Sequence, residues 1–451
     1  MGLRREHGFS RRELLVVGAI IGVCFSIFRH APRRQSGGDS RYSILLSDNL
    51  IRHRDFALER YDLPRPDYRL EEVGGHRYYA FPVGTSILSV PYVAAMRLRG
   101  ISAFDADGSY DLQLEQMLDA HLAAILMAGF AAVVYLTARL LVPIPWALVV
   151  TFATAFGTQV FSTTSRALWS DTWGVLLTGL AGFLLLRAAV LRKVPCFPVL
   201  ATIEAWAYIV RPTSSLALLG TALYLAVTMR RAPWQFLATA GAWLGLFAIY
   251  SWRHFHHLLP GYYEAGRLGF GDVGPALLGN LVSPSRGLLV CVPLVVAVAL
   301  LLFRYRRALR FGGLLTLVLS LIGGHLLVLS GFSHWWGGHC FGARLTASLV
   351  PWIVILEILA IDARRQARAR GEPYAARLAV LALAGVLSIL SVAINAVGAF
   401  SLEAQKWNVS PDIDETPWRL WSWRHPQFLA PFFGTDSTDP TAVAPGLPAP
   451  R

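Results

Sequence analysis

Charged side chains are scarce in this chain, and a few of them interrupt or border its apolar runs in patterns that suit chemistry. Two acids and three arginines stand out: Asp39, Asp171, Arg211, Arg286 and Arg344. A carboxylate can accept a proton as a general base, and a guanidinium can bind a phosphate through two parallel hydrogen bonds. These residue types therefore suit a reaction in which a hydroxyl loses a proton and a phosphate departs.

Each of the two acids begins a predicted helix and therefore has a second explanation. Asp39 lies in the segment GGDSRY (37–42), directly before an amphipathic stretch. An aspartate at that position can accept hydrogen bonds from backbone N–H groups and act as a helix cap. Asp171 opens a later apolar run, where an acid also complements the helix dipole. A catalytic role and a capping role remain open for both acids.

The arginines also lie at the ends of predicted helices. Arg286 and Arg344 each open an apolar run, and both lie in segments rich in glycine, proline or serine. The N-terminus of a helix combined with an arginine favours a phosphate. Arg211 lies at a break between two apolar runs, where a membrane-anchoring arginine is the alternative.

Further candidates are less specific. Asp48 is the alternative base near Asp39, and Tyr42 is a candidate pocket residue of the same region. His334 and His339, joined by an acid from elsewhere in the fold, would suit a divalent metal. Their spacing alone does not identify a metal site, and no cofactor is required by the sequence.

The composition shows which kind of protein must position these residues. Of the 451 residues, 55% are apolar and 15% are charged, whereas about a quarter are charged in an ordinary soluble domain. A soluble globular enzyme is therefore excluded. The net charge of +13 comes from arginine clusters that border apolar runs, which is typical of a polytopic membrane protein and leaves no basic face for nucleic acid. The four cysteines form no disulfide or metal-binding pattern.

The apolar runs predict an all-α membrane protein with about eleven transmembrane helices. The first run is expected to be an uncleaved helix, because no signal-peptidase site follows it. The positive-inside rule places residues 1–12 in the cytoplasm and the tail, 400–451, outside, with disorder after about 434. The transmembrane unit covers 13–399. The predicted spans are 13–28, 117–138, 144–162, 170–188, 195–210, 213–229, 233–252, 287–303, 311–331, 345–361 and 376–399.

The region 30–115 is predicted to be a long first extracytoplasmic loop. Its segment 80–96 is apolar but contains two prolines, and we expect it to lie at the interface, because a full crossing would reverse every later arginine cluster. The stretch after Tyr42 predicts an amphipathic helix on the membrane surface. With this topology, all five residues considered first come to the outer face.

Several motifs together resemble a known family. The segments GDSRY (38–42), YYAFPVGTS (78–86), ALWSD (167–171) and VRPT (210–213) are followed by two arginine motifs. These motifs are SPSRG (283–287) and GHCFGAR (338–344). Their order is similar to that in bacterial GT-C membrane glycosyltransferases, the group related to protein O-mannosyltransferases and to the lipid A aminoarabinose transferase. Each motif is weakly specific, whereas the order covers most of the chain.

The resemblance implies an inverting glycosyltransferase of the inner (plasma) membrane. Such enzymes transfer a sugar from a polyprenyl-phosphate donor to a glycan, lipid or protein acceptor at the outer face. By motif match, Asp39 takes the role of the family's candidate catalytic acid. Two positions depart from the pattern: Ser40 replaces a frequent second acid, and Ala343 replaces a frequent proline. The absence of a nucleotide-binding glycine pattern suits a lipid-linked donor.

Two other functions remain as alternatives. A flippase or transporter of lipid-linked saccharides would also need outer-face arginines and an apolar bundle. No internal repeat is visible, and the polar residues gather on one side rather than at the midplane, which argues against that class. A polymerase of lipid-linked saccharides predicts similar arginines but does not explain the loop that carries Asp39.

Overall fold

The computed structural model describes residues 11–32, 38–104, 109–228, 233–371 and 374–433. Of these described residues, 71% lie in helices and few lie in strands. The N-terminal residues 1–10 and the predicted disordered segment after 434 lie outside the described residues.

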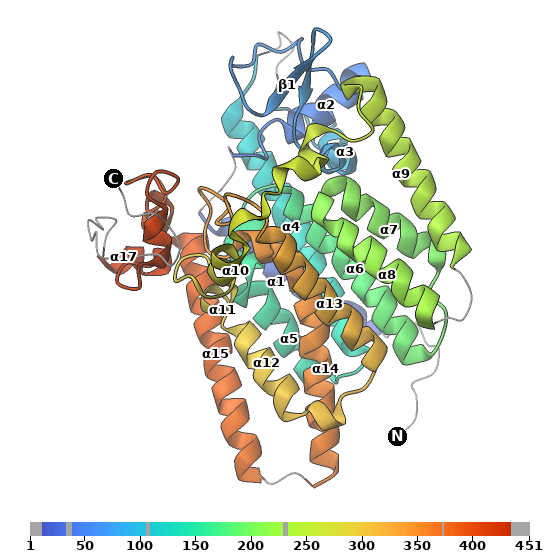
Figure 1. Cartoon of the computed structure of the whole chain (residues 1–451), viewed down its shortest axis with the longest axis vertical. Coiled ribbons are helices and arrows are strands. Elements are labelled where there is room, and N and C mark those ends of the chain that lie inside the picture. Colours follow the sequence, from blue (N-terminus) through green and yellow to red (C-terminus); the bar gives the residue numbers. More distant parts are fainter. Residues whose placement is uncertain (1–10, 33–37, 105–108, 229–232, 372–373, 434–451) are drawn as a thin grey trace.

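A bundle of helices forms the body of the molecule (Figure 1). A helix overlaps each of the eleven predicted apolar runs, although the run 287–303 is divided in two before Pro293. The bundle helices are α1 (Arg11–His30), α4 (Leu112–Arg139), α5 (Ile144–Gly157), α6 (Ser170–Leu191), α7 (Phe197–Val210), α8 (Ser215–Thr228), α9 (Trp234–Phe255), α10 (Val273–Val282), α11 (Leu288–Cys291), α12 (Leu294–Arg304), α13 (Gly312–Leu329), α14 (Val350–Ala369) and α15 (Tyr374–Phe400).

Six helices of the described chain are long and apolar enough to cross a membrane: α1, α4, α6, α13, α14 with the turn before it, and α15. Large apolar side chains that are exposed on the bundle surface also indicate a membrane protein. Leu15 in α1, Leu223 in α8, Ile249 in α9 and Ile389 in α15 are all more than half exposed. Such a surface would be unstable in water but suits contact with lipid. The fold therefore supports a membrane protein.

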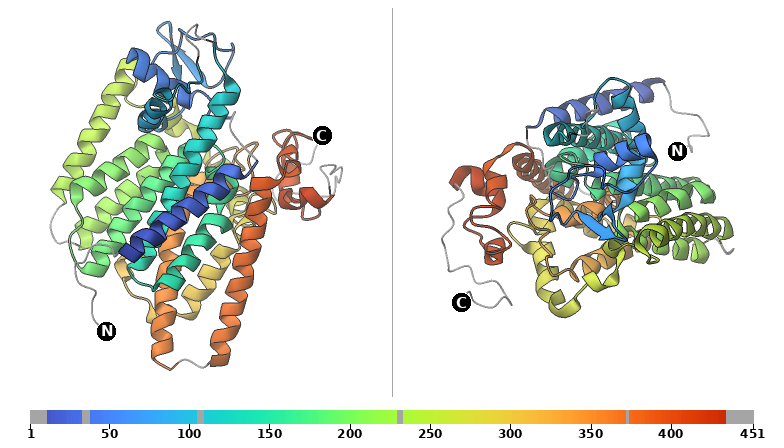
Figure 2. Two further views of the ribbon diagram at one scale, coloured as in Figure 1. Left: turned by 180° about the vertical axis from the view of Figure 1, so that it is seen from behind. Right: turned by 90° about the horizontal axis from the view of Figure 1, so that it is seen from above.

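Many of the packed helix pairs in the bundle are close to one another in the sequence. Helix α1 lies along α4 on the face seen from behind in Figure 2. Between α5 and α6 the chain makes a tight π-helical turn, Val160–Thr164. Threonine hydroxyls donate to the backbone within this region, from Thr158 to the carbonyl of Thr154 and from Thr163 to that of Gln159. This turn brings the segment before α6 to the end of the bundle.

The described residues of the predicted loop 30–115 that precede α4 form a compact body at the end of the bundle, at the top of Figure 1. Its elements are α2 (Ser43–His53), a hairpin of β1 (Leu70–Val73) and β2 (His76–Tyr79), and α3 (Val83–Arg97). The two strands are antiparallel, with Leu70 opposite Tyr79. The first seven residues of α2 are buried in the protein. The prediction that this helix lies on the membrane surface with a polar face in water is wrong for these residues, because Ser43, Ser47, Asp48 and Asn49 are buried along with the apolar ones, beside α3 and α4.

The C-terminal segment folds beside the bundle, near α10 and α11 (Figure 1). It contains α16 (Glu403–Lys406), α17 (Ala430–Phe433) and short 3-10 turns. Trp407 and Leu420 from this segment pack with Trp335 and Trp336 from the loop after α13. The tail and this loop thus share one small apolar core.

Candidate active site

Asp39 and Arg344 meet at the end of the bundle although 305 residues separate them in the sequence. The guanidinium Nη2 of Arg344 donates to the carboxylate of Asp39 at 3.3 Å. The guanidinium carbon of Arg344 also lies 3.5 Å from the centre of the Trp169 ring, a cation–π contact that fixes its orientation. Two predicted site residues are therefore brought together by the fold.

A small pocket, with a cavity volume of about 10 Å³, lies between these residues. Its lining combines one acid, one cation and several aromatic side chains, a mixture typical of ligand sites. The lining residues are Asp39, Tyr79, Phe81, Pro82, Thr85, Leu168, Trp169, Ser170, Tyr262 and Arg344. The indole N–H of Trp169 is buried without a hydrogen-bond partner in the described structure.

The backbone around Asp39 is held by its neighbours in the loop body. The Tyr79 hydroxyl donates to the carbonyl of Asp39, and Arg69 Nε donates to the carbonyl of Gly38 at 2.8 Å. A side chain at position 38 would place its Cβ 3.1 Å from the Trp169 ring. Glycine at this position therefore lets the loop pack closely on Trp169.

A second layer of contacts fixes Arg69. Its guanidinium pairs with Asp67 at 2.9 Å, and Asp67 accepts the Tyr42 hydroxyl at 2.8 Å. Burial and this hydrogen bond raise the pKa of Tyr42 to about 12, so the hydroxyl stays protonated and donates. Burial alone would raise the pKa of Asp67, but hydrogen bonds from Arg69 and Tyr42 hold it below its ordinary value. Tyr42 thus helps to hold Asp67 and Arg69, and through Arg69 the backbone next to Asp39.

Asp39 does not cap the helix that follows it. Helix α2 begins at Ser43, and the amides of Tyr42 and Leu45 donate to the carboxylate of Glu115 on α4. Glu115 therefore fills the capping role that the sequence offered to Asp39. The Asp39 carboxylate contacts Arg344 and, at 3.5 Å, the Tyr68 hydroxyl.

Asp171 and Arg211 form a separate, buried pair. Arg211 Nη1 lies 3.0 Å from Asp171 Oδ2, and both side chains are almost fully enclosed. Ser348 donates to the other oxygen of Asp171 at 3.1 Å, and Arg211 also donates to Ser170. Asp171 makes no side-chain cap for α6, whose N-cap residue is Trp169. The pair joins α6, the break after α7 and the turn before α14.

Arg286 is fully engaged by protein acceptors. Its five N–H groups meet the carbonyls of Trp336, Ser285 and Gly338 and the side-chain oxygens of Gln427 and Asn408. A guanidinium has five donors, so this arrangement leaves none for a phosphate. Among the described residues, Arg286 makes no hydrogen bond or ion pair with Asp39 or Arg344. Its contacts instead join the C-terminal segment to the loop after α13.

The remaining candidates lie outside the pocket. Asp48 is buried in α2 between Arg52 and Arg97, at 2.5 and 3.1 Å. His339 meets Asp412 and Asp414 of the C-terminal segment. His334 lies apart from that group and packs on Trp336. Only Asp39 and Arg344 of the predicted site residues line the pocket.

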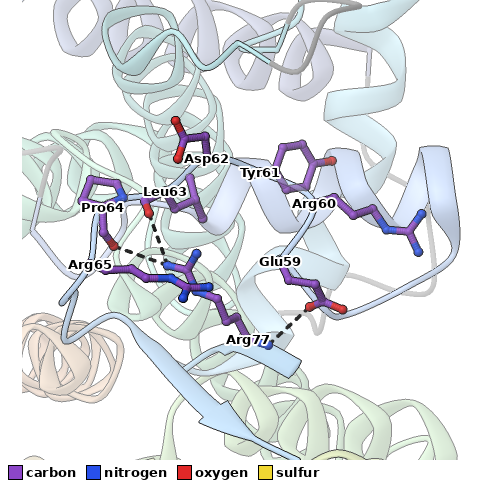
Figure 3. A pocket seen from close by; sticks show the side chains of 8 residues that line it. All are labelled: Glu59, Arg60, Tyr61, Asp62, Leu63, Pro64, Arg65 and Arg77. Atoms are coloured by element: carbon purple, nitrogen blue, oxygen red, sulfur yellow. Dashed lines mark hydrogen bonds between the residues drawn. The ribbon is translucent and has the colours of Figure 1, made fainter. Parts of the chain in front are cut away.

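A wider polar pocket lies in the loop body, lined by residues 59–65 and Arg77 (Figure 3). Arg77 is buried and donates to the carbonyls of Leu63 and Pro64 at 3.5 and 3.3 Å. Arg77 and Tyr79 are two residues apart on β2, so they share one face of the strand. The strand therefore links this pocket to the pocket at Asp39.

The aromatic lining of the site was missed at the level of sequence. Tyr79 and Phe81 lie in the motif YYAFPVGTS and Trp169 lies in ALWSD, but only Asp171 of these two motifs was predicted to belong to the site. Tyr262, in the turn Gly261–Tyr263, lies in no such motif. Aromatic side chains within a motif at a helix end were the available signal for the first three.

No protein-family model matches this chain, and no curated protein matches it.

Proposed function

We propose that the protein is an integral-membrane glycosyltransferase that transfers a sugar from a polyprenyl-phosphate donor to an acceptor hydroxyl with inversion. The observation that carries this proposal is the Asp39–Arg344 pair at the mouth of an aromatic-lined pocket. The pair combines a proton acceptor and a phosphate-binding cation. The apolar bundle beneath it suits a donor whose carrier lies in lipid.

In this mechanism the donor phosphate competes with Asp39 for Arg344. Arginine binds phosphate oxygens through its paired donors, and the ring of Trp169 keeps the guanidinium in place while the partner changes. The Asp39 carboxylate, 35% exposed, is then free to meet the acceptor. Binding of the donor thus prepares the base.

Bond changes follow from these positions. The acceptor oxygen attacks the anomeric carbon from the face opposite the phosphate, and its proton passes to Asp39. The bond between the anomeric carbon and the phosphate oxygen breaks, and the lipid phosphate leaves with the bonding electrons. Arg344 stabilises the charge that develops on that phosphate. The pocket is too small for a sugar ring as it stands, so its aromatic side chains must move apart as the donor binds; their apolar faces then contact the ring and restrict water.

The acceptor is proposed to approach through the polar pocket of the loop body (Figure 3). The guanidinium groups of Arg65 and Arg77 both lie within 4 Å of a carboxylate oxygen of Glu72. Mixed cationic and anionic groups of this kind suit the hydroxyls of a polar acceptor. Strand β2 then leads from this pocket to Asp39.

The proposed topology has eleven spans in the inner membrane, with the N-terminus inside and the site outside. Cysteine labelling tests it in a Cys196→Ser background, because Cys196 is the exposed native thiol of the described residues. Impermeant reagent added to intact cells should label Asp62→Cys and should not label Arg307→Cys until the cells are opened. Labelling of Arg307→Cys in intact cells would reverse the orientation.

A transfer assay tests the activity directly. Purified protein in detergent is incubated with radiolabelled polyprenyl-phosphate sugars and candidate acceptors, and product is separated from donor by chain length and charge. Transfer in detergent, where no second compartment exists, excludes a flippase or transporter as the explanation. Products that contain many donor units instead of one would favour the polymerase alternative.

A further inference from the structure

Three side chains from two distant segments form a second polar group that shares no residue with the proposed active site. His339 lies in the loop after α13, and Asp412 and Asp414 lie in the C-terminal segment. His339 Nε2 is 3.0 Å from Asp412 Oδ1 and 3.8 Å from Asp414 Oδ2. All three side chains are partly exposed, so the group is open to ions.

The spacing of these atoms fits a shared metal ion. Zinc bonds to imidazole nitrogen and carboxylate oxygen are about 2.0–2.2 Å long, so tetrahedral ligand atoms lie roughly 3.3–3.6 Å apart. The two distances from His339 lie on either side of that range, and all three ligand atoms lie within 4.8 Å of one another. Small side-chain rotations would bring them onto one ion.

Surrounding hydrogen bonds already orient the two carboxylates. The Trp336 indole N–H donates to Asp414 Oδ1 at 2.7 Å, which leaves Oδ2 directed toward His339. The backbone N–H of Asp414 donates to Asp412 Oδ1 at 2.9 Å. Such outer contacts set ligand direction in metal sites.

The loop that carries His339 is also fixed. Gly337 and Gly338 have positive φ angles of 74° and 64°, a conformation that glycine adopts without strain. Arg286 donates hydrogen bonds to the backbone carbonyls of Trp336 and Gly338. The turn therefore presents His339 to the tail in a defined direction.

An exposed histidine–aspartate pair is the simpler explanation of one contact. Such a pair adds little stability, because solvent screens exposed charges, and it needs only one carboxylate. Here a second, separately oriented carboxylate faces the same imidazole nitrogen. Cys340 is not a fourth ligand, because its buried thiol donates to the carbonyl of Trp336.

We propose that His339, Asp412 and Asp414 bind a divalent transition-metal cation, for which Zn²⁺ is the probe. The imidazole favours Zn²⁺ over Mg²⁺ and Ca²⁺, and solvent completes the coordination. The bound ion ties the C-terminal segment to the loop that leads into Arg344. This site does not depend on the proposed transferase activity.

Isothermal titration of the purified full-length protein tests this site. The protein carries an affinity tag without histidine, is stripped with a chelator, and is titrated with Zn²⁺. One high-affinity site is expected, with a dissociation constant that rises at least about tenfold in His339→Ala and in Asp412→Asn. Excess Mg²⁺ or Ca²⁺ should not compete.

His334→Ala is the matched control, because it removes a histidine of the same loop that is not a ligand. Its affinity should equal that of the unaltered protein. Circular dichroism and elution volume establish that each variant is folded. We expect the His339 variant to fold, because this side chain is exposed. Absence of a high-affinity site in the unaltered protein, or equal loss of affinity in His334→Ala, would overturn the proposal.

Discussion

Two of the acid–arginine pairs in the molecule are chemically alike but lie in different surroundings. Asp39 and Arg344 are 3.3 Å apart beside a pocket, and the acid is 35% exposed. Asp171 and Arg211 are 3.0 Å apart, and the exposed fractions of their side chains are 1% and 8%. In the proposed mechanism the first pair exchanges its partner for a ligand, whereas the second pair is enclosed.

The difference separates a reactive arrangement from a structural one. An enclosed ion pair is costly to break from one side, because the remaining charge stays buried without a partner. Removing one partner of a partly exposed pair costs less stability, because water or a ligand replaces the missing partner. The same substitution should therefore change the transfer rate when it is made at Asp39 and the stability when it is made at Asp171.

Substitution of Asp39 by Asn should give the largest effect on turnover. General base catalysis typically contributes about 10²- to 10⁴-fold, so transfer should slow by that factor while the melting temperature stays near that of the unaltered protein. Radiolabel transfer at saturating donor measures the rate. Full activity in a folded Asp39→Asn protein would contradict its role as the base.

Substitution of Asp171 by Asn should instead lower stability. It leaves Arg211 buried without its carboxylate, at a cost of about 3–5 kcal/mol. Unfolding in detergent or lipid discs, followed by tryptophan fluorescence, measures this loss. A double variant that also changes Arg211 to Gln should recover part of it, and no recovery would show that the two residues act separately.

Substitution of Arg344 by Lys should weaken donor binding by about tenfold, which is about 1.4 kcal/mol. Lysine offers a point charge and cannot form the paired hydrogen bonds of a guanidinium. Equilibrium binding of a non-transferable polyprenyl phosphate measures the affinity. Arg211→Lys is the matched control and should bind the donor normally if it folds. The reverse ranking would move the phosphate site to Arg211.

Asp67 should give a smaller, pH-dependent effect on the loop that holds Asp39. Its pKa is lower in the folded protein than in the unfolded chain, so its stabilising contribution is present above the unfolded pKa, about 4, and is lost as the pH falls through the folded value. Asp67→Asn should therefore cost about 1 kcal/mol at pH 7. The difference in melting temperature should shrink on acidification, and a constant difference would contradict this account.

Arg65 should give the smallest effect, because two-thirds of its side chain is exposed. Contacts of this kind contribute at most about 1 kcal/mol, so Arg65→Ala should raise the acceptor KM by up to about fivefold. Donor affinity should not change. Kinetics at varied acceptor concentration and at varied donor concentration distinguish an effect on the acceptor KM from an effect on donor affinity. A change in donor affinity alone would contradict acceptor binding in this pocket.

Much of the helical architecture followed from the sequence, because apolar runs near twenty residues long have few alternatives to helices. Boundaries near Pro143 and Pro212 were also close, since proline favours the first turn of a helix. The placement of α2 was wrong. Its apolar spacing is the same whether the polar face meets water or protein, so periodicity could not show that α3 and α4 enclose it.

The candidate site was predicted in its residue types but not in its pairing. Nothing local indicates that Asp39 meets Arg344 while Asp171 meets Arg211, because these contacts join segments 305 and 40 residues apart. Arg286 illustrates the same limit. Its motif resembles that of a ligand-binding arginine, and only the packed C-terminal segment supplies the acceptors that occupy all its donors.

The sequence by itself determined that the chain forms apolar helices and that the acids and arginines considered for the site lie near their ends. Those properties depend on hydrophobicity, proline and local spacing, which act within about twenty residues. The tertiary structure decided which acid faces which cation, which pair is sealed, and which aromatic rings line the pocket. Burial and partner choice arise from contacts between distant segments, so they exist only once the chain has packed.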